Sequence, residues 1–369
     1  MNIMGLHQKN KVVHQVLAPQ SKGGVSSEFR ALEQSKLAEK YEFIPLLLDK
    51  GHKGVNLPDI LFYYRGIKKA KPDIVHVRGA GVDGLNAEIA AKLAGQAKVL
   101  LCVHGMYSDF VYYHPIKKWI ARYVIEPLCF KFADGISCVY EECEKRENFQ
   151  KYRKKIVPFV YNRIPHYSDK KRLETRESVR RQLGIKKEDV VGVFCGRVSK
   201  EKGLMFLAKA LIVNQAQIDE SMHFLIVGVG DYLADFKKAI ESYPKLANNV
   251  HFLGVMDDVE SILSASDYFI MPSLHENHSI ALLEAMAMEL PAITTDVGGN
   301  KETVKEGEFG IIIPPFDDRA LAQAIFKMRD NEQRNSFKEQ IRAYSFSEFS
   351  NEAVDAQLDV AYQEILQRR

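Results

Sequence analysis

Short apolar runs alternate with longer amphipathic stretches along nearly the whole chain. Such runs are typical of strands buried on both faces of a parallel sheet, and apolar residues at helical spacing between them indicate helices. The strands expected in the first half are Val12–Ala18, Phe43–Leu48, Ile74–Val77, Val99–His104, Gly135–Tyr140 and Ile156–Val160. Those expected in the second half are Val190–Cys195, Phe224–Val227, Val250–Leu253, Tyr268–Met271, Ala292–Thr295 and Ile311–Ile313. The alternation predicts an α/β fold with doubly wound parallel sheets.

The chain changes character between Asn162 and Arg181, where it becomes polar and charged. Pro165 and the run SDKKRLETRE in this stretch predict an interdomain linker that leads into a short helix. The last stretch, from about Phe349 to Gln367, has apolar residues at helical spacing and predicts a long amphipathic helix. With 369 residues, two domains with separate cores are expected. The expected segments are residues 1–163, residues 164–346 and a C-terminal segment of residues 347–369.

Composition is that of a folded soluble protein, with 46% hydrophobic and 27% charged residues. The net charge is only +3, but residues 1–165 carry 26 Lys and Arg against 16 Asp and Glu, whereas the remainder carries 25 against 32. The basic first half fits either an anionic surface or acceptor, or ordinary solvated charge, and both interpretations stay open. No nucleic-acid partner is expected.

The opening sequence MNIMGLHQKNKVV lacks the apolar core of a signal peptide, and nowhere do eighteen apolar residues run together. A cytoplasmic location is therefore expected. The five cysteines form no C-x-x-C pair and are interpreted as buried thiols. Asp257 and Asp258 precede apolar residues at helical spacing, so they predict a helix N-terminus, and no catalytic metal is expected.

The most informative stretch runs from Met271 to Val304. A strand ends before Pro272, a polar loop follows, and Ser279 caps a helix that reaches about Met288. A helix that begins at the carboxyl end of a parallel strand favours a bound phosphate. Glu284 lies on this helix among apolar neighbours, and a buried carboxylate without hydrogen-bond donors would cost several kcal/mol.

The two hydroxyls of a ribose would supply those donors to Glu284. Glu276, in the loop before the helix, would accept hydrogen bonds from hydroxyls of a second ring. The alternative is that Glu276 is only an acid at a helix start and that Glu284 is an unrelated core residue.

The spacing of these acids also carries a family resemblance. Glu276, seven further residues and Glu284 follow Pro272 and Ser273, and the signature continues with Pro291, Asp296, Gly298, Gly299 and Glu302. This pattern resembles the donor site of the family-four retaining glycosyltransferases, the group 1 enzymes of GT-B type. The resemblance implies that Glu276 holds the transferred sugar and Glu284 the nucleotide ribose. It also implies two Rossmann-like domains that face each other across a cleft, with the C-terminal helix crossing back to the first.

Two cations, Arg197 and Lys202, flank the turn after the strand that ends at Cys195. Fixed cations stabilise the charge that grows on a departing diphosphate, and the resemblance implies this role for both; the alternative is ordinary surface charge. The resemblance also implies that Gly254 meets the nucleobase and that Glu302 reaches the donor sugar. The full expected donor-binding set is Gly23, Gly24, Arg197, Lys202, Gly254, Asn277, His278, Ser279, Ile280, Glu284 and Glu302. The expected catalytic residues are His104, Glu276, Arg197 and Lys202.

Two candidates lie in the first half of the chain. His104 ends an expected strand, and the resemblance implies a place beside the transferred sugar; the alternative is a histidine with a structural hydrogen bond. Gly23 and Gly24 form a pair that is more often only a turn, although the resemblance implies a loop that faces the donor phosphates and the acceptor. The Gly228–Asp231 turn does not predict a dinucleotide site, because Leu233 occupies the position of the third glycine.

The segment from Pro115 to Phe132 mixes basic and aromatic residues. It fits a helix on anionic lipid headgroups, which would make the protein peripheral to the inner face of a membrane. A plain packing helix with a kink at Pro127 is the favoured interpretation.

The sequence therefore predicts retaining transfer of a sugar from a nucleotide-sugar substrate to a hydroxyl of a glycan or lipid-linked glycan, in cell-surface polysaccharide biosynthesis. UDP-linked sugars are the first expectation for the donor and GDP-mannose the second, and no further cofactor is expected. No residue is marked as a covalent nucleophile, which favours front-face attack. The alternatives are a nucleotide-sugar epimerase, a phosphorylase, or a non-catalytic nucleotide-sugar binding protein of the same fold.

Overall fold

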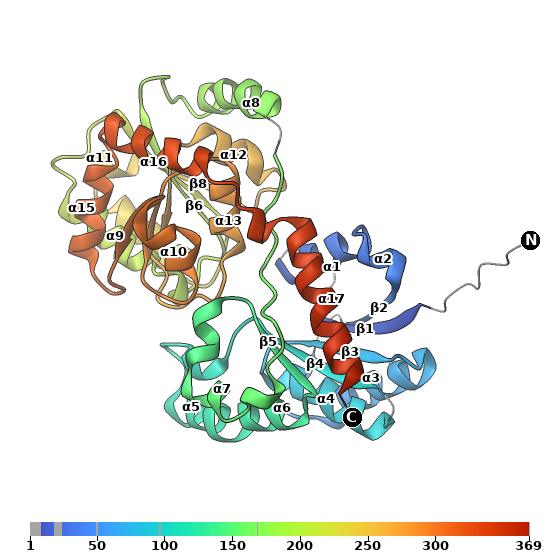
Figure 1. Ribbon diagram of the computed structural model, residues 1–369. Coiled ribbons are helices and arrows are strands. Elements are labelled where there is room, and N and C mark those ends of the chain that lie inside the picture. The colour runs from blue at the N-terminus through green and yellow to red at the C-terminus, as the bar shows by residue number, and fades with distance from the viewer. Residues whose placement is uncertain (1–8, 18–23, 49–50, 96, 168, 369) are drawn as a thin grey trace, which may run out of the picture. The chain divides into compact units, whose positions relative to one another are not determined.

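The computed structural model describes residues 9–17, 24–48, 51–95, 97–167 and 169–368. The chain forms two compact units: the first combines Met1–Arg163 with Ser347–Arg369, and the second is Ile164–Phe346. Each unit has its own parallel sheet and its own core (Figure 1). Within the described ranges, no helix is long and apolar enough to cross a membrane.

The first sheet has the strand order β2-β1-β3-β4-β5, and all neighbouring pairs are parallel. Its strands are β1 (Asn10–Leu17), β2 (Tyr41–Leu48), β3 (Ile74–Arg78), β4 (Lys98–Val103) and β5 (Gly135–Cys138). The helices of this unit are α1 (Gly24–Glu33), α2 (Leu37–Lys40), α3 (Leu57–Ala70), α4 (Val82–Ala94), α5 (Pro115–Ile120), α6 (Glu126–Phe132), α7 (Glu147–Gln150) and α17 (Asn351–Gln367). A π-helical turn, η2 (Ala121–Ile125), joins α5 to α6.

The strand expected over Ile156–Val160 does not form. Only Ile156 makes a bridge, to Ile136 of β5, and the segment continues along β5 with single backbone hydrogen bonds from Val157 and Val160. Pro158 interrupts the segment and has no N–H to donate, so a regular ladder cannot continue there. The first sheet therefore ends at β5.

The C-terminal helix α17 completes the core of the first unit, as expected, and it runs along the sheet of that unit (Figure 1). Its Tyr362 is fully buried, and the hydroxyl lies 2.8 Å from Nδ1 of His76 and 3.2 Å from Nε2 of His14. Burial holds the pKa of both histidines well below its usual value, so both rings are neutral at pH 7. Asp355 of α17 also forms an ion pair with Arg163 at 2.6 Å.

The second sheet has the order β11-β10-β9-β6-β7-β8, again with every pair parallel. Its strands are β6 (Val190–Cys195), β7 (Met222–Val227), β8 (Val250–Gly254), β9 (Tyr268–Met271), β10 (Ala292–Thr295) and β11 (Gly310–Ile313). Its helices are α8 (Asp169–Gln182), α9 (Leu204–Val213), α10 (Leu233–Glu241), α11 (Pro244–Ala247), α12 (Val259–Ala265), α13 (Ile280–Ala287), α14 (Asn300–Thr303), α15 (Asp318–Lys327) and α16 (Asn331–Ala343). This strand order is that of the dinucleotide-binding doubly wound fold.

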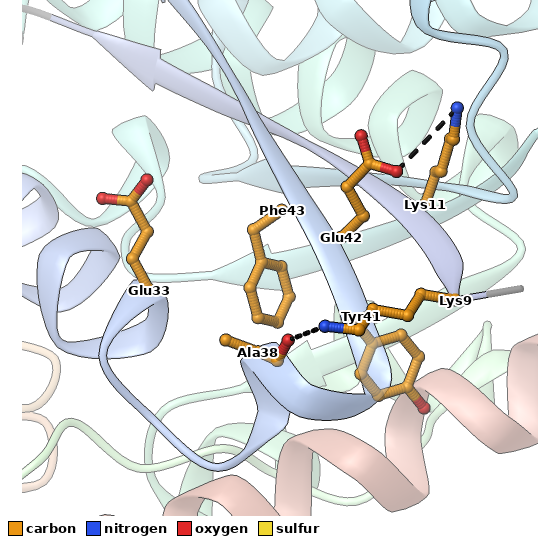
Figure 2. Close-up of a pocket in the computed structure, with 7 residues that line it drawn as sticks. All are labelled: Lys9, Lys11, Glu33, Ala38, Tyr41, Glu42 and Phe43. Atoms are coloured by element: carbon orange, nitrogen blue, oxygen red, sulfur yellow. Dashed lines mark hydrogen bonds and ion pairs between the residues drawn. The ribbon is translucent and has the colours of Figure 1, made fainter. Parts of the chain in front are cut away.

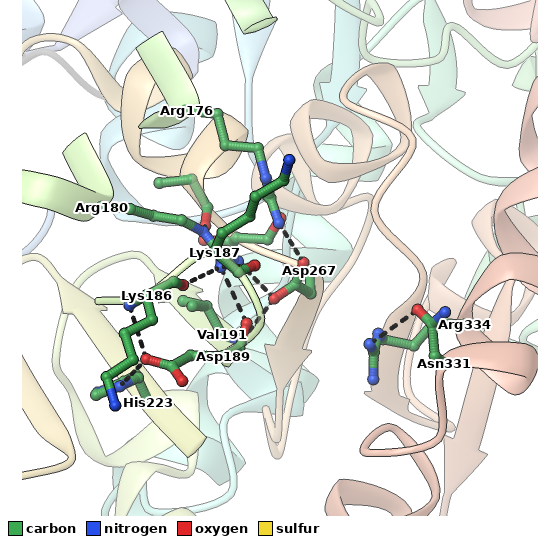
Figure 3. Close-up of polar contacts among 12 residues, drawn as sticks. Arg176, Arg180, Lys186, Lys187, Asp189, Val191, His223, Asp267, Asn331 and Arg334 are labelled. Atoms are coloured by element: carbon green, nitrogen blue, oxygen red, sulfur yellow. Dashed lines mark hydrogen bonds and ion pairs between the residues drawn. The ribbon is translucent and has the colours of Figure 1, made fainter. Parts of the chain in front are cut away.

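The polar stretch expected to be mainly a linker is instead the helix α8, which is held by an ion-pair cluster (Figure 3). Arg176 and Arg180 of α8 each pair with one carboxylate oxygen of Asp267, at 2.5 and 2.7 Å. The backbone N–H of Val191 donates to the same carboxylate at 2.7 Å. Arg180 also donates to the carbonyl of Ala265 at 2.8 Å. Asp267 therefore fastens α8 to the amino ends of β6 and β9.

We expect the substitution Asp267→Asn to lower the free energy of unfolding of the second unit by about 3 kcal/mol, because it leaves two largely buried guanidinium groups without their counter-charge. Urea unfolding followed by circular dichroism measures this. The matched control is Glu306→Gln, since Glu306 makes an exposed pair with Lys301 and should change stability by less than about 1 kcal/mol. Equal effects of the two substitutions would contradict the anchoring role of Asp267.

Candidate active site

The candidate site lies at the carboxyl ends of β6 and β9 in the second unit. These strands are neighbours, with Val193 opposite Phe269, and the chain order runs outward from them in opposite directions. The loops that follow such a pair of strands diverge and leave open space for a ligand outside the sheet edge. The loops 196–203 and 272–279 fill these two positions and carry most of the candidate residues.

Glu276 and Lys202 meet in this space. Nζ of Lys202 lies 2.5 Å from Oε1 of Glu276, and the hydroxyl of Ser273 donates to the same oxygen at 2.7 Å. Both side chains are mostly buried, with 26% of Lys202 and 10% of Glu276 exposed. The carboxylate is therefore held in one orientation by a cation from the β6 loop and a hydroxyl from its own loop.

Two glycines allow these loops to pack backbone against backbone. A Cβ atom on Gly298, which has φ of +54°, would lie 2.2 Å from the carbonyl oxygen of Glu276. A Cβ atom on Gly203, with φ of +69°, would lie 1.9 Å from the carbonyl oxygen of Pro272. Only glycine fits both the positive φ and the close approach. The loops after β6, β9 and β10 therefore form one interlocked layer around Glu276.

Glu284 lies in the second turn of α13, and its environment differs from that of Glu276. It is partly buried, and burial raises the pKa of its carboxyl group to about 7. Among the described residues, no side chain or backbone group pairs with it. Burial, and secondly the charge of Glu284, raise the pKa of the Cys195 thiol at the end of β6 and of the Tyr167 hydroxyl. A carboxylate in this position gains from a ligand that donates hydrogen bonds.

Arg197 follows Gly196 at the end of β6 and is exposed. In the described part of the chain it has no ion-pair partner, unlike Lys202. A guanidinium group on a short loop at this sheet edge is free to bind an incoming phosphate. The two cations expected to bind the diphosphate thus come from one loop. Lys202 is already paired with Glu276, whereas Arg197 has no ion-pair partner among the described residues.

At the start of α13, the N–H groups of Ile280 and Ala281 have no hydrogen-bond partner within the part of the chain that the structure describes. Ser279 is the N-cap and accepts a hydrogen bond from the N–H of Leu282 at 3.4 Å, and the helix begins at Ile280, as expected. The carbonyl of Asn277 accepts a hydrogen bond from Gly299 at 2.5 Å. His278 is buried, and burial lowers its pKa to about 3, so the ring is neutral. The first turn therefore offers the positive end of a helix dipole without a competing charge.

The remaining second-unit candidates lie at neighbouring strand ends. Gly254 is the last residue of β8, has φ of +68°, and has open space where a side chain would be. Glu302 is partly exposed on α14. Asn300 is the first residue of this helix, and its side-chain amide donates to the carbonyl of Thr295 at 3.1 Å.

Several structural residues of the site were missed from the sequence. Ser273 was noted only as part of the signature, although it binds Glu276. The turn after β7, rejected as a dinucleotide fingerprint, uses Gly228 and Gly230 for close packing: Cβ atoms there would lie 1.9 Å and 2.3 Å from carbonyl oxygens of the β6 loop. The local sequence does not show that Gly228 and Gly230 pack against the backbone of the loop after β6.

Two family models match this chain. The model described as Glycosyl transferases group 1 matches residues 175–344, which contain both candidate glutamates and both cations. The model described as Glycosyl transferase 4-like matches residues 25–139. The chain belongs to the group 1 glycosyltransferases.

Two similar curated proteins are a galactosyltransferase with a lipid-linked acceptor and a glycosyltransferase of capsule biosynthesis. It is 28% identical over 312 residues to the UDP-Gal:alpha-D-GlcNAc-diphosphoundecaprenol alpha-1,3-galactosyltransferase of Escherichia coli, covering 81% of this chain and 77% of that one. It is 24% identical over 304 residues to the capsular polysaccharide biosynthesis glycosyltransferase CapM of Staphylococcus aureus, with coverage of 81% and 78%.

Solved structures of the GT-B type share the fold. Alr3699/HepE of Anabaena, crystallised with UDP-glucose, matches with a TM-score of 0.77 at 17% identity, covering 96% of this chain and 99% of that one. The expected architecture of two Rossmann-like domains is thus confirmed.

Of the first-unit candidates of the glycosyltransferase, His104 lies at the expected end of a strand. His104 directly follows β4, is partly exposed, and donates its backbone N–H to the carbonyl of Cys102 at 3.1 Å. Gly24, expected in a turn or loop, is instead the first residue of α1. Gly23 lies outside the described residues. Their roles stay predictions.

A separate pocket of about 550 Å³ lies in the first unit and is unrelated to these candidates (Figure 2). Its lining residues are Lys9, Lys11, Glu33, Ala38, Tyr41, Glu42 and Phe43. Most of them belong to the amino ends of β1 and β2, whereas ligands of doubly wound sheets bind outside the carboxyl ends. The pocket is also closed in part by an ion pair of Lys11 with Glu42 at 3.8 Å. We therefore do not assign the reaction to it.

We expect Gly298→Ala to reduce transferase activity at least about 10-fold, because the new methyl group displaces the backbone of Glu276. The control is Gly184→Ala, since Gly184 has a similar φ of +70° but open space around its Cβ position. Both substitutions should cost about 1 kcal/mol of stability for the positive φ. If Gly184→Ala lowered activity as much as Gly298→Ala, backbone strain rather than loop contact would explain the loss.

Proposed function

We propose that this glycosyltransferase moves a sugar from a UDP-linked donor to a hydroxyl of a glycan or lipid-linked glycan in cell-surface polysaccharide synthesis, with retention of configuration and without a metal ion. The observation that carries the proposal is the ion pair of Glu276 with Lys202, next to a helix whose Glu284 has no partner among the described residues. One acid is oriented by the protein and the other still needs hydrogen-bond donors.

Each candidate then has a role in the proposed donor complex. The ribose hydroxyls donate to Glu284. The diphosphate lies against Arg197, Lys202 and the N–H groups at the start of α13. The base lies at Gly254, where the backbone is accessible, and Glu276 and Glu302 accept hydrogen bonds from the sugar. When the diphosphate arrives, Lys202 is shared between it and Glu276, which couples donor binding to the orientation of that carboxylate.

Support for a uridine donor and a lipid-linked acceptor comes from two similar proteins. The Escherichia coli relative uses UDP-Gal with a diphosphoundecaprenol-linked acceptor. Alr3699/HepE of Anabaena was crystallised with UDP-glucose. GDP-mannose is the second candidate donor. These relatives are transferases, so an epimerase or a non-catalytic binding protein is not favoured.

In the proposed reaction the acceptor hydroxyl attacks the anomeric carbon from the side of the leaving diphosphate. The bond from the anomeric carbon to the phosphate oxygen breaks, the new glycosidic bond forms, and the acceptor proton passes to the departing diphosphate oxygen. Negative charge grows on the diphosphate as this happens, and Arg197 and Lys202 stabilise it in place of a metal. Because Glu276 is fixed by Lys202 and Ser273, we assign it to orienting the sugar rather than to accepting the proton.

A thermal-shift screen of nucleoside diphosphates, followed by sugars of the base that stabilises most, tests the donor assignment. Transfer with the best donor in EDTA, with the product anomer read by NMR, then tests retention and metal independence. An inverted product or activity that depends on added metal would overturn those parts. Epimer formed from donor alone would point to the isomerase instead.

We expect Glu276→Gln to lower kcat about 100-fold, because the sugar loses an oriented anionic acceptor during transfer. Glu284→Gln should instead raise the donor KM on the order of 10-fold, since it weakens hydrogen bonds made equally before and during the reaction. Steady-state kinetics separates the two effects. Glu241→Gln, on exposed α10, serves as the unchanged control. If both variants changed kcat to the same extent and KM to the same extent, the assignment of Glu276 to transfer and of Glu284 to donor binding would be refuted.

Donor affinity should rise with pH. The carboxylate form of Glu284 accepts hydrogen bonds from the ribose, so binding lowers its pKa from about 7 and releases a proton. At pH 6 most unliganded sites are protonated, so the affinity for UDP-glucose should be about 10-fold lower than at pH 8. Calorimetry measures this, and the phosphates of UDP-glucose do not titrate in that range. Glu284→Gln should remove the pH dependence of the affinity. If the affinity of that variant still changed with pH to the same extent, another group would be responsible.

A further inference from the structure

An apolar surface of unusual exposure lies on the first unit, along α5 and η2. We call it the α5 face: it consists of Ile116, Trp119, Ile120, Tyr123 and Val124. Trp119 and Tyr123 are each more than half exposed, at 58% and 59%, and Ile116 is exposed at 65%. These positions follow helical spacing, so they form one stripe rather than scattered single residues. Exposed apolar stripes of this kind mark interaction surfaces.

The stripe points outward because the other side of the segment is fixed to the core. Ala121 is buried, and the side chain of Glu126 accepts two hydrogen bonds from Ser108, from its N–H and its hydroxyl, both at 2.8 Å. Further along, Cys129 and Phe130 are fully buried. The favoured prediction of a plain packing helix is therefore correct for α6 and wrong for α5, in which no residue is buried.

The charged residues of the segment that forms the α5 face are all basic. Lys117 and Arg122 are exposed beside the stripe, and Lys118 lies next to them. From Phe110 to Ile125 the sequence contains no Asp or Glu. The acids that bracket this stretch are already engaged, Asp109 with Arg146 at 2.7 Å and Glu126 with Ser108. This segment thus combines exposed apolar side chains with cations and contains no acidic residue of its own.

We propose that the α5 face docks the protein on an anionic lipid bilayer, with Trp119 and Tyr123 in the interfacial layer and Lys117, Lys118 and Arg122 against the headgroups. Amphipathic aromatic rings favour the boundary between headgroups and acyl chains, and lysine and arginine beside them bind anionic lipid. This inference goes beyond the proposed reaction and does not depend on the donor.

A second copy of the chain is a poorer occupant. A two-fold symmetric contact through the α5 face would place its three cations against their equivalents, without an acid in the stretch to neutralise them. A bilayer that contains acidic lipid supplies both the apolar layer and the opposite charge.

Trp119 is the only tryptophan in the chain, so its fluorescence reports this surface alone. The test uses the full-length protein with vesicles of phosphatidylcholine and 30% phosphatidylglycerol. We expect a blue shift of the emission, quenching by brominated phosphatidylcholine, and reversal by 0.5 M NaCl. Vesicles of phosphatidylcholine alone should bind about 100-fold more weakly, given about 1 kcal/mol for each of three cations.

Two double variants retain the reporter. Ile116→Ser with Tyr123→Ser should weaken vesicle binding at least 10-fold by removing inserted apolar groups. Lys117→Gln with Arg122→Gln should weaken it about 30-fold and flatten its salt dependence. The matched controls are Leu93→Ser, which changes a residue 64% exposed on α4, and Lys53→Gln with Lys69→Gln, which removes the same net charge elsewhere on the unit. Both controls should bind like the original protein.

The proposal fails if the Trp119 emission does not respond to anionic vesicles, or if neutral vesicles bind equally well. It also fails if the controls weaken binding as much as the α5 variants. A dimer in solution that shields Trp119 from acrylamide without lipid would assign the face to a second copy instead. Because none of these readouts involves transfer, an inactive protein that still binds vesicles would refute only the proposed reaction.

Discussion

The close packing of loop backbones at the carboxyl edge of the second sheet is the constraint on which the candidate site depends. Gly298 against Glu276 and Gly203 against Pro272 leave no room for a side chain. Loops usually vary in position because few contacts fix them, but these contacts are between main-chain atoms and cannot be relaxed by a change of rotamer. The position of the Glu276 carboxylate is therefore set by the sheet, through three neighbouring strand ends, rather than by the loop that carries it.

The two glutamates differ in how their charge is compensated. Glu276 already has a cation and a hydroxyl, so it is ready to orient a ligand without reorganisation. Glu284 has only partial burial and the resulting raised pKa, so the unliganded protein holds it near half-protonation at neutral pH. Burial of Glu284 without hydrogen-bond donors costs free energy in the folded, unliganded protein. A ligand that donates hydrogen bonds to Glu284 removes this cost, so the gain adds to the binding free energy.

Much of this could be predicted from the sequence, and the failures have physical causes. The strands β6, β9 and β10 match their predicted bounds because burial on both faces makes a parallel strand one continuous apolar run. The segment Ile156–Val160 was wrongly predicted as a strand, because the apolar pattern does not show that Pro158 lacks the backbone N–H needed for a strand ladder. Helix α8 was taken mainly for a linker, since the counter-charge of its Arg176 and Arg180 is Asp267, which is distant in the sequence. The contact of Lys202 with Glu276 joins residues 74 positions apart and has no local signal. The mixture of basic and aromatic residues in α5 was visible in the sequence, but composition cannot say which side of a helix faces solvent.

The place of α17 has a consequence for how the protein is made. The second unit is one uninterrupted stretch, whereas the first is completed by residues that follow it. A ribosome therefore releases everything needed for the second sheet while the first still lacks Tyr362, and His14 and His76 lack their shared hydroxyl partner until α17 has been synthesised. A truncation within α17 would thus damage the sheet of the first unit, which is synthesised before the second unit but finishes folding after it.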